Sequence, residues 1–147
     1  MPRIIKYTPI TTPETTHQIA LPEADPPCQE LATVAGEIYI SLPTDAVLPA
    51  QPPEIAASIV EVTPDDTLRA AIIAASPHCR LIDERMRSLI RDAYPLEDEL
   101  KYARIGVGAA NGLYQPTADE IAGMMAFGAH VEAVRQWGRD QRAALGL

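Results

Sequence analysis

The side chains that could perform metal or redox chemistry are few in this chain. Histidine occurs as His17, His78 and His130, and cysteine as Cys28 and Cys79. His78 and Cys79 are adjacent, so on a helix their side chains would point about 100° apart and could not both face one metal ion. No CxxC pair is present, and two thiols do not make a disulfide framework. We therefore expect free cysteines and no bound metal.

Two further patterns could indicate chemistry, but each has a structural explanation. The run GVGAANG, residues 106–112, contains GxG, whereas the dinucleotide fingerprint requires GxGxxG between a strand and a helix. The acidic run 97–99 follows Pro95, and in the first turn of a helix negative charge is favoured by the helix dipole. No serine lies in a glycine-rich nucleophile elbow. We expect no catalytic residues and no cofactor, and the chain is not predicted to be an enzyme.

The composition argues against nucleic-acid-binding, membrane-spanning and secreted proteins. The chain has 147 residues, enough for one ordinary domain, and only 5% of them are aromatic, so a core would consist mainly of Ala, Leu, Ile and Val. The formal charge of −8 disfavours binding to the phosphates of nucleic acids. No apolar run approaches the roughly 18 residues that a membrane span requires, and no secretory leader is recognisable. We expect a soluble protein made in the cytoplasm.

Proline divides the sequence into two halves, and ten of the fourteen prolines fall within the first 63 residues. Proline lacks a backbone donor and fixes φ, which disfavours helices and central strands. Two short strands are expected, EIYISL at 37–42 and ASIVEV at 57–62. An isolated two-stranded ribbon is marginally stable. We therefore predict that residues 1–62 form an extended, proline-rich arm that has no core of its own and is ordered by neighbouring molecules.

The second half predicts a helical domain over residues 63–147, so the expected fold class is mainly α with three or four helices. Thr63 is a candidate N-cap for a helix that runs to about Ala75, and Ser76–Pro77 repeats the signal for a second helix. The next helix begins after Pro95, is expected to turn Leu96, Leu100 and Ala103 inward, and ends at Gly106.

A loop is then expected over residues 106–116. The run TADE, residues 117–120, is a capping box in which the Thr117 hydroxyl and the Glu120 carboxylate bond each other's backbone N–H groups. It opens a long helix that should extend to about Leu145.

Candidate interface residues come from both halves. Arginines concentrate on two of the predicted helices. Most are expected to be solvated or paired with nearby acids, and the alternative interpretation is that they form a protein-binding face. Trp137 lies close to arginines, a composition enriched at interface hot spots, although it could equally anchor the helix bundle. The candidates are Ile38, Ile40, Leu42, Ile59 and Val60 on the strands of the arm, and Arg135, Trp137 and Arg139 on the last helix.

The run SPHCRLIDERMRSLIRDAYPLEDELKYARIG, with the ending VRQWGRDQRAALGL, resembles small tail-associated proteins of tailed bacteriophages. The shared pattern is a helix with an arginine-rich end, a tyrosine–proline step, an acidic D-E-L helix, and Trp-Gly-Arg in the last helix. The resemblance covers about residues 76–147. It implies a role in the virion or in tail assembly, and it brings no catalytic residues.

The expected function is therefore a structural component of a bacteriophage virion, in the tail or at the tail tip or baseplate. Its expected partners are other virion proteins in a symmetric, multicopy assembly, with no nucleic acid and no membrane span, and its expected location is the virion after synthesis in the host cytoplasm. Two alternatives stay open. One is a tail or tail-fibre assembly chaperone that is absent from the mature particle, and the other is a small phage-encoded inhibitor of a host protein.

Overall fold

The computed structural model describes residues 2–147, which form two compact units. The first, here called the sheet unit, extends to Leu81 and also includes Gln141–Leu147. The second, here called the helical unit, is Ile82–Asp140. Helices make up 51% of the chain, but the sheet makes the fold class mixed α/β rather than mainly α.

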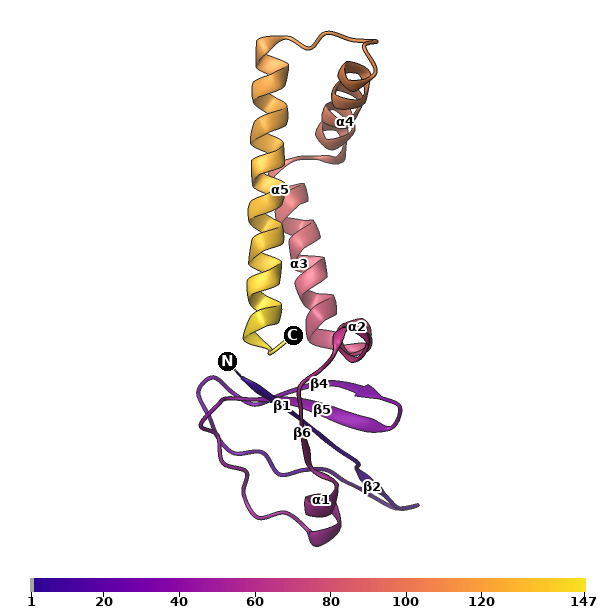
Figure 1. Ribbon diagram of the computed structural model, residues 1–147, viewed down its shortest axis with the longest axis vertical. Helices are drawn as coiled ribbons and strands as arrows, with labels where there is room; N and C mark the ends of the chain where they lie inside the picture. The colour runs from indigo at the N-terminus through magenta and orange to yellow at the C-terminus, as the bar shows by residue number, and fades with distance from the viewer. Residues whose placement is uncertain (1) are drawn as a thin grey trace. The chain divides into compact units, whose positions relative to one another are not determined.

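The sheet unit is built on four antiparallel strands in the spatial order β4-β5-β1-β6. Their bounds are β1 Arg3–Tyr7, β4 Gln29–Val34, β5 Glu37–Leu42 and β6 Val60–Val62. A separate small hairpin pairs β2, Ile10–Thr11, with β3, Thr16–His17. Two short helices, α1 Pro53–Ser58 and α2 Asp66–Ala75, complete the unit (Figure 1).

The register of β1 against β5 places large apolar side chains on one face. Ile5 lies opposite Ile40, and Tyr7 lies opposite Ile38. Directly opposed residues of an antiparallel pair share a face, so these side chains pack together. Ile55 of α1 covers them, and the buried cluster consists of Ile5, Tyr7, Ile19, Ile38, Ile40, Leu42, Ala46 and Ile55. Helix α2 packs against β4, and its Ile72 is fully buried.

The prediction of an extended arm without a core over residues 1–62 is wrong for the described residues of that range. The prolines lie outside the strands: Pro2 and Pro9 flank β1, Pro43 follows β5, and Pro53 opens α1. Proline disrupts a ladder where it removes a donor inside a strand, so these positions leave the pairing intact. Pro43 is itself buried and adds apolar material to the unit. The sequence analysis missed β1, β4 and the small β2–β3 hairpin, and of these β1 stands between prolines and joins β5 to β6.

The turn between β4 and β5 is a two-residue hairpin loop. Ala35 has φ 52° and Gly36 has φ 84°. Two successive positive φ values match the right-handed twist of paired strands, which favours this turn between long strands. The strand predicted at 37–42 is confirmed as β5, whereas only residues 60–62 of the strand predicted at 57–62 are paired, as β6, because Ala57 and Ser58 end α1.

The four helices predicted after residue 62 are present, with some shifted ends. The bounds of the remaining three are α3 Pro77–Ala93, α4 Leu96–Ala110 and α5 Ala118–Ala144. Asp65, not Thr63, caps α2, because its carboxylate accepts a bond of 2.8 Å from the Leu68 N–H. Helix α4 continues past the predicted end at Gly106, so the loop begins at Asn111.

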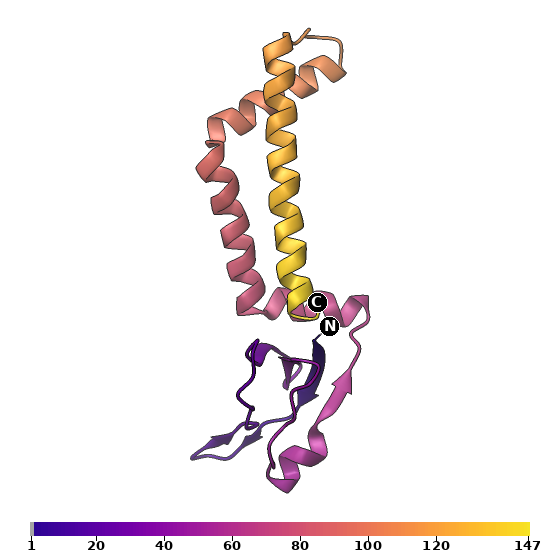
Figure 2. The ribbon, with the colours of Figure 1, turned by 90° about the vertical axis from the view of Figure 1, so that its left-hand side faces the viewer.

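The first described residues, from Pro2, and the C-terminal turn lie together in the sheet unit, as both views show (Figures 1 and 2). Gly146 has φ 84°, and a Cβ atom there would lie 3.3 Å from Cγ1 of Ile4. Ile4 and Leu145 are both buried. The C-terminal turn is therefore part of the packing around β1.

Shortening a side chain in the sheet core should destabilise the sheet unit. Ile40 is 1% exposed, so Ile40→Ala should cost about 2–5 kcal/mol of unfolding free energy through lost burial and a residual cavity. The matched control Val60→Ala, at a side chain 49% exposed, should cost less than about 1 kcal/mol. Native-state hydrogen exchange of the β1 and β5 amides measures both. Unprotected amides in the unmodified chain would show that the sheet is not formed in solution.

Candidate protein-interaction surface

Residues 82–93 of α3 run alongside the part of α5 that carries His130 and Gly138, while α4 lies beside the N-terminal part of α5 (Figures 1 and 2). Gly138 lets α3 and α5 approach closely, since a Cβ atom at this position would collide with the Met86 side chain. His130 contributes a polar contact, with its Nε2 atom 3.1 Å from the Leu89 carbonyl oxygen. Val134 and Gly138 are the buried residues of α5.

An aromatic cluster holds α4 against α5. The rings of Tyr102 and Phe127 are stacked with centroids 5.7 Å apart, and Tyr94 meets Phe127 edge to face at 5.2 Å. His130 lies 5.4 Å from the Tyr94 ring. Such offset and edge-to-face contacts are the preferred geometries of aromatic pairs. Because the rings come from α4, α5 and the α3–α4 connection, the cluster fixes which side of α4 faces the unit.

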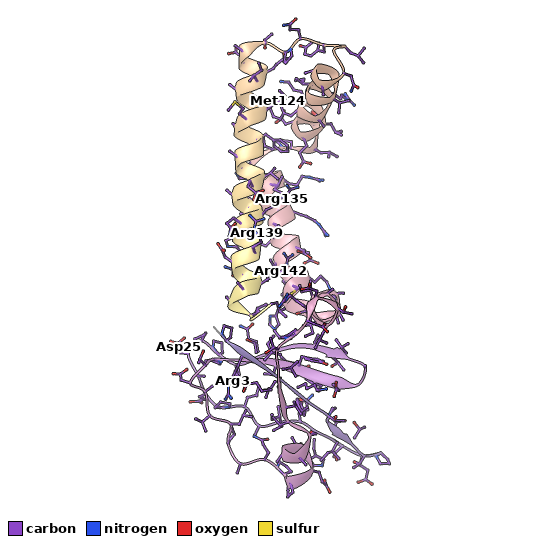
Figure 3. All side chains as sticks on the ribbon, in the orientation of Figure 1. Arg3, Asp25, Met124, Arg135, Arg139 and Arg142 are labelled. Carbon is purple, nitrogen blue, oxygen red and sulfur yellow. The ribbon has the colours of Figure 1, made fainter. Side chains whose placement is uncertain are left out.

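A glycine of α5 makes room for this cluster. A Cβ atom at Gly123 would lie 2.8 Å from the Tyr102 hydroxyl oxygen and 2.9 Å from a ring carbon. Real Cβ atoms do not approach so closely, so the Tyr102 ring occupies the space that any other residue would fill. Met124, the next residue, lies at the level of α4 (Figure 3), and its Sδ atom is 3.9 Å from the Cβ position of Gly106.

Helix α4 is apolar on two opposite sides. Ile105 is 8% exposed and faces the unit together with Tyr102. At about 100° per residue, Leu96 lies half a turn from Ile105, and Ala103 and Val107 lie within about 20° of that opposite direction. Leu96 is 48% exposed, Leu100 46% and Val107 63%. These residues, Leu96, Leu100, Ala103 and Val107, are here called the outer stripe of α4.

The prediction that Leu96, Leu100 and Ala103 turn inward is wrong. Both sides of α4 carry apolar residues at spacings of three and four, so the periodicity alone does not select one. The side that carries Tyr102 is buried because its ring joins the aromatic cluster and fits over Gly123. The spacing of Tyr102, Ile105 and Ala109 was the signal in the sequence that could have revealed the second side.

Small residues make the outer stripe concave. An open hollow is lined by Leu100, Ala103, Arg104, Val107 and Gly108. Other exposed apolar side chains lie outside the outer stripe, namely Leu113, Tyr114, Ile121 and Met125. The outer stripe itself, an exposed row on one side of a single helix, is typical of a surface that binds another protein.

Charged side chains border one edge of the outer stripe. Glu97 and Arg104 are both exposed, and neither side chain has an ion-pair or hydrogen-bond partner among residues 2–147. Glu99 differs, because it accepts a bond of 3.1 Å from Arg91 of α3 and is part of the unit's own packing. The charges of Glu97 and Arg104 are therefore available to a partner.

The predicted capping box stabilises the end of the connection from α4 to α5. The capping box at 117–120 is confirmed: the Glu120 N–H donates to the Thr117 hydroxyl at 3.3 Å, and the Thr117 N–H donates to the Glu120 carboxylate at 2.8 Å. The Tyr114 hydroxyl donates to the same carboxylate at 2.9 Å. The bond from the Thr117 N–H, followed by that from Tyr114, lowers the pKa of Glu120, while the carboxylate raises the pKa of Tyr114.

The candidates predicted on the strands lie mostly in the core. Ile38, Ile40 and Leu42 are 5%, 1% and 0% exposed in the sheet unit, where they face their own chain. Ile59 is partly buried against the same cluster. Val60 on the edge strand β6 is the exposed one of the five. The predicted face of β5 is buried, within its own unit, but Tyr39 and Ser41 on the opposite face are buried too, so the prediction of a single buried face is wrong.

The candidates predicted on the last helix lie on α5, with Arg135 and Arg139 on successive turns (Figure 3). Arg139 bonds Glu132 at 2.6 Å and also bonds Gln136, and Arg135 lies 4.0 Å from Glu132. The bond from Arg139 lowers the pKa of Glu132. Trp137 is half-buried. These arginines are exposed, yet they bond within their own helix.

Neither a metal site nor a membrane span is found in the part of the chain that the structure describes. No three His, Cys, Asp or Glu side chains of residues 2–147 come together as metal ligands, and no helix among them is long and apolar enough to cross a bilayer. Comparisons with protein-family models, curated proteins and solved structures gave no match.

Adding a methyl group at Gly123 should destabilise the helical unit, whereas the same change at Gly128 should not. Alanine is favoured over glycine in a helix by about 1 kcal/mol, and nothing lies within 4 Å of the Cβ position of Gly128, so Gly128→Ala should be neutral or stabilising. Gly123→Ala must displace Tyr102, with a net cost of about 1–3 kcal/mol. Denaturation followed by the fluorescence of Trp137, the single tryptophan, compares them. Equal effects would contradict the placement of the Tyr102 ring.

Acidification should weaken the start of α5 through Glu120. The folded state lowers the pKa of this carboxyl, so its stabilising contribution is present above the unfolded value and is lost as the pH falls through the folded pKa. Glu120→Gln should therefore flatten the loss of stability between neutral pH and about pH 3. The control Glu84→Gln, at an exposed position of α3, should retain the slope of the unmodified chain. A Glu120→Gln profile equal to that of the control would contradict the role of the cap.

Proposed function

We propose that this protein is a structural component of a bacteriophage virion, associated with the tail or with the tail tip or baseplate. It binds neighbouring subunits through its helical unit. The observation that carries the proposal is the outer stripe of α4, a row of large apolar side chains left in solvent on the side of the helix away from its own unit.

Exposed apolar side chains in a row are costly unless another molecule covers them, and they mark interaction sites on folded proteins. The stripe lies within the part of the chain, residues 76–147, that resembles small tail-associated proteins. Two independent lines, one from exposure and one from the sequence pattern, therefore support protein binding by the helical unit. The sheet unit is closed over its own core, so the proposed contacts do not depend on an N-terminal arm.

A second candidate is a tail or tail-fibre assembly chaperone. The same closed sheet unit favours it, because residues that pack within their own unit do not tether the protein to a neighbour, so it can leave the assembly when its task is complete. An exposed apolar stripe would then cover a partner's apolar surface before that partner is incorporated.

Mass spectrometry of purified particles tests the proposal and separates the two candidates. A structural component should be found in particles at a fixed ratio to a known tail protein, and cross-links should join the helical unit to other virion proteins. A chaperone should be found in lysates of producing cells, bound to a tail protein, and be lost from finished particles. Absence from both particles and tail-protein complexes would contradict both functions.

A further inference from the structure

We infer that the outer stripe of α4 binds the same stripe of a second copy of this chain, with the two α4 helices antiparallel. The proposal goes beyond the function above and holds whether or not the protein enters a virion. It rests on the spacing of the stripe, the sizes of its side chains and the charges at its edge.

The stripe has the spacing of a helix-pairing seam. Leu96, Leu100, Ala103 and Val107 are separated by four, three and four residues, which is the heptad alternation of a and d positions. All four lie on the side of α4 opposite the buried Ile105. A helix that already packs on its own unit therefore carries a second seam for a partner helix.

Side-chain sizes favour the antiparallel orientation. A two-fold axis near the middle of the stripe sets Leu100 against Ala103 of the second copy, and Leu96 against its Val107. Large residues then face smaller ones, and every contact occurs twice, as in a closed two-fold interface. A parallel pair would set Ala103 against Ala103, which leaves a gap beside Leu100.

The charges at the edge of the stripe complement each other in the same arrangement. The two-fold axis brings Glu97 of one copy beside Arg104 of the other, and the reverse pair is formed by symmetry. Both side chains are exposed and have no partner within residues 2–147. In a parallel pair, Arg104 of one copy would have to pair with Glu99 of the other. Glu99 already accepts a hydrogen bond of 3.1 Å from Arg91 of its own chain.

The seam is short, so the association should be weak. Fifteen residues of helix span about 22 Å, and an interface of that length belongs to the small, transient class. Copies held close together by other contacts would pair much more readily, because the second contact becomes intramolecular.

Charge reversal in the full chain tests both the pairing and its orientation. Sedimentation of the unmodified protein from about 10 μM to about 1 mM should show reversible growth from the 15.9 kDa monomer toward a dimer. Glu97→Arg and Arg104→Glu should each weaken dimerisation about tenfold, because each places like charges together at both edges.

Mixing the two single variants in equal amounts should restore association. One copy then presents two arginines and the other two glutamates at the edge, so both pairs attract in an antiparallel complex. Rescue by mixing also excludes a folding defect in either variant. If each variant is weak and the mixture stays weak, the antiparallel pairing is wrong.

Substitution in the seam itself provides the second test. Leu100→Glu should abolish dimerisation, whereas Met125→Glu, at a side chain of α5 that is 71% exposed, should leave it unchanged. Circular dichroism checks that both variants retain their helices. A monomeric unmodified chain at all concentrations, or loss of association with Met125→Glu alone, would overturn the proposal.

Discussion

The packing of one aromatic ring determines which side of α4 the helical unit buries and which side it exposes to solvent. Tyr102 stacks on Phe127 and occupies the space above Gly123, where a Cβ atom would lie 2.8 Å from its hydroxyl oxygen. This contact selects the side of α4 that is buried, because both sides of the helix are apolar. The outer stripe is exposed as a direct consequence. The surface proposed to bind partners therefore exists because a glycine on α5 admits a tyrosine from α4.

Because residues of the N-terminal half form a sheet unit with its own core, a role in assembly can no longer be inferred from an N-terminal half that lacks one. A proline-rich N-terminus without a core would have needed neighbouring molecules for its order, and that need would itself have indicated an assembly. The structure instead closes β1, β5 and their neighbours over eight buried residues and leaves the prolines outside the strands. Binding is therefore argued from the helical unit, where apolar area stays in solvent, rather than from a lack of internal order.

The charges of the helical unit fall into two groups. Glu120, Glu132 and Glu99 are bonded by groups of their own unit, from the capping box, α5 and α3, and these bonds fix local geometry. Glu97 and Arg104 are exposed and have no such partner within the described residues, and they stand at the edge of an apolar stripe. Rim charges contribute little affinity by themselves, but they set orientation by making the wrong arrangement repulsive. This division is the physical reason why these two side chains are assigned a role in recognition.

Local signals in the sequence determined the helices α2 to α5, the strand β5 and the capping box at 117–120, but not α1, which lies in the segment predicted to be extended. These signals are prolines in the first turn of a helix, side-chain caps and alternating apolar residues. Each involves only residues that are close in the chain, so each can be recognised from the sequence alone. Tertiary structure alone decided that β1 pairs with β5 across a long separation, that Ile38, Ile40 and Leu42 are covered by their own unit, and which side of α4 is exposed. These outcomes depend on which of several compatible apolar surfaces meet, and that choice is made by the fit of rings, glycines and strand registers between distant segments.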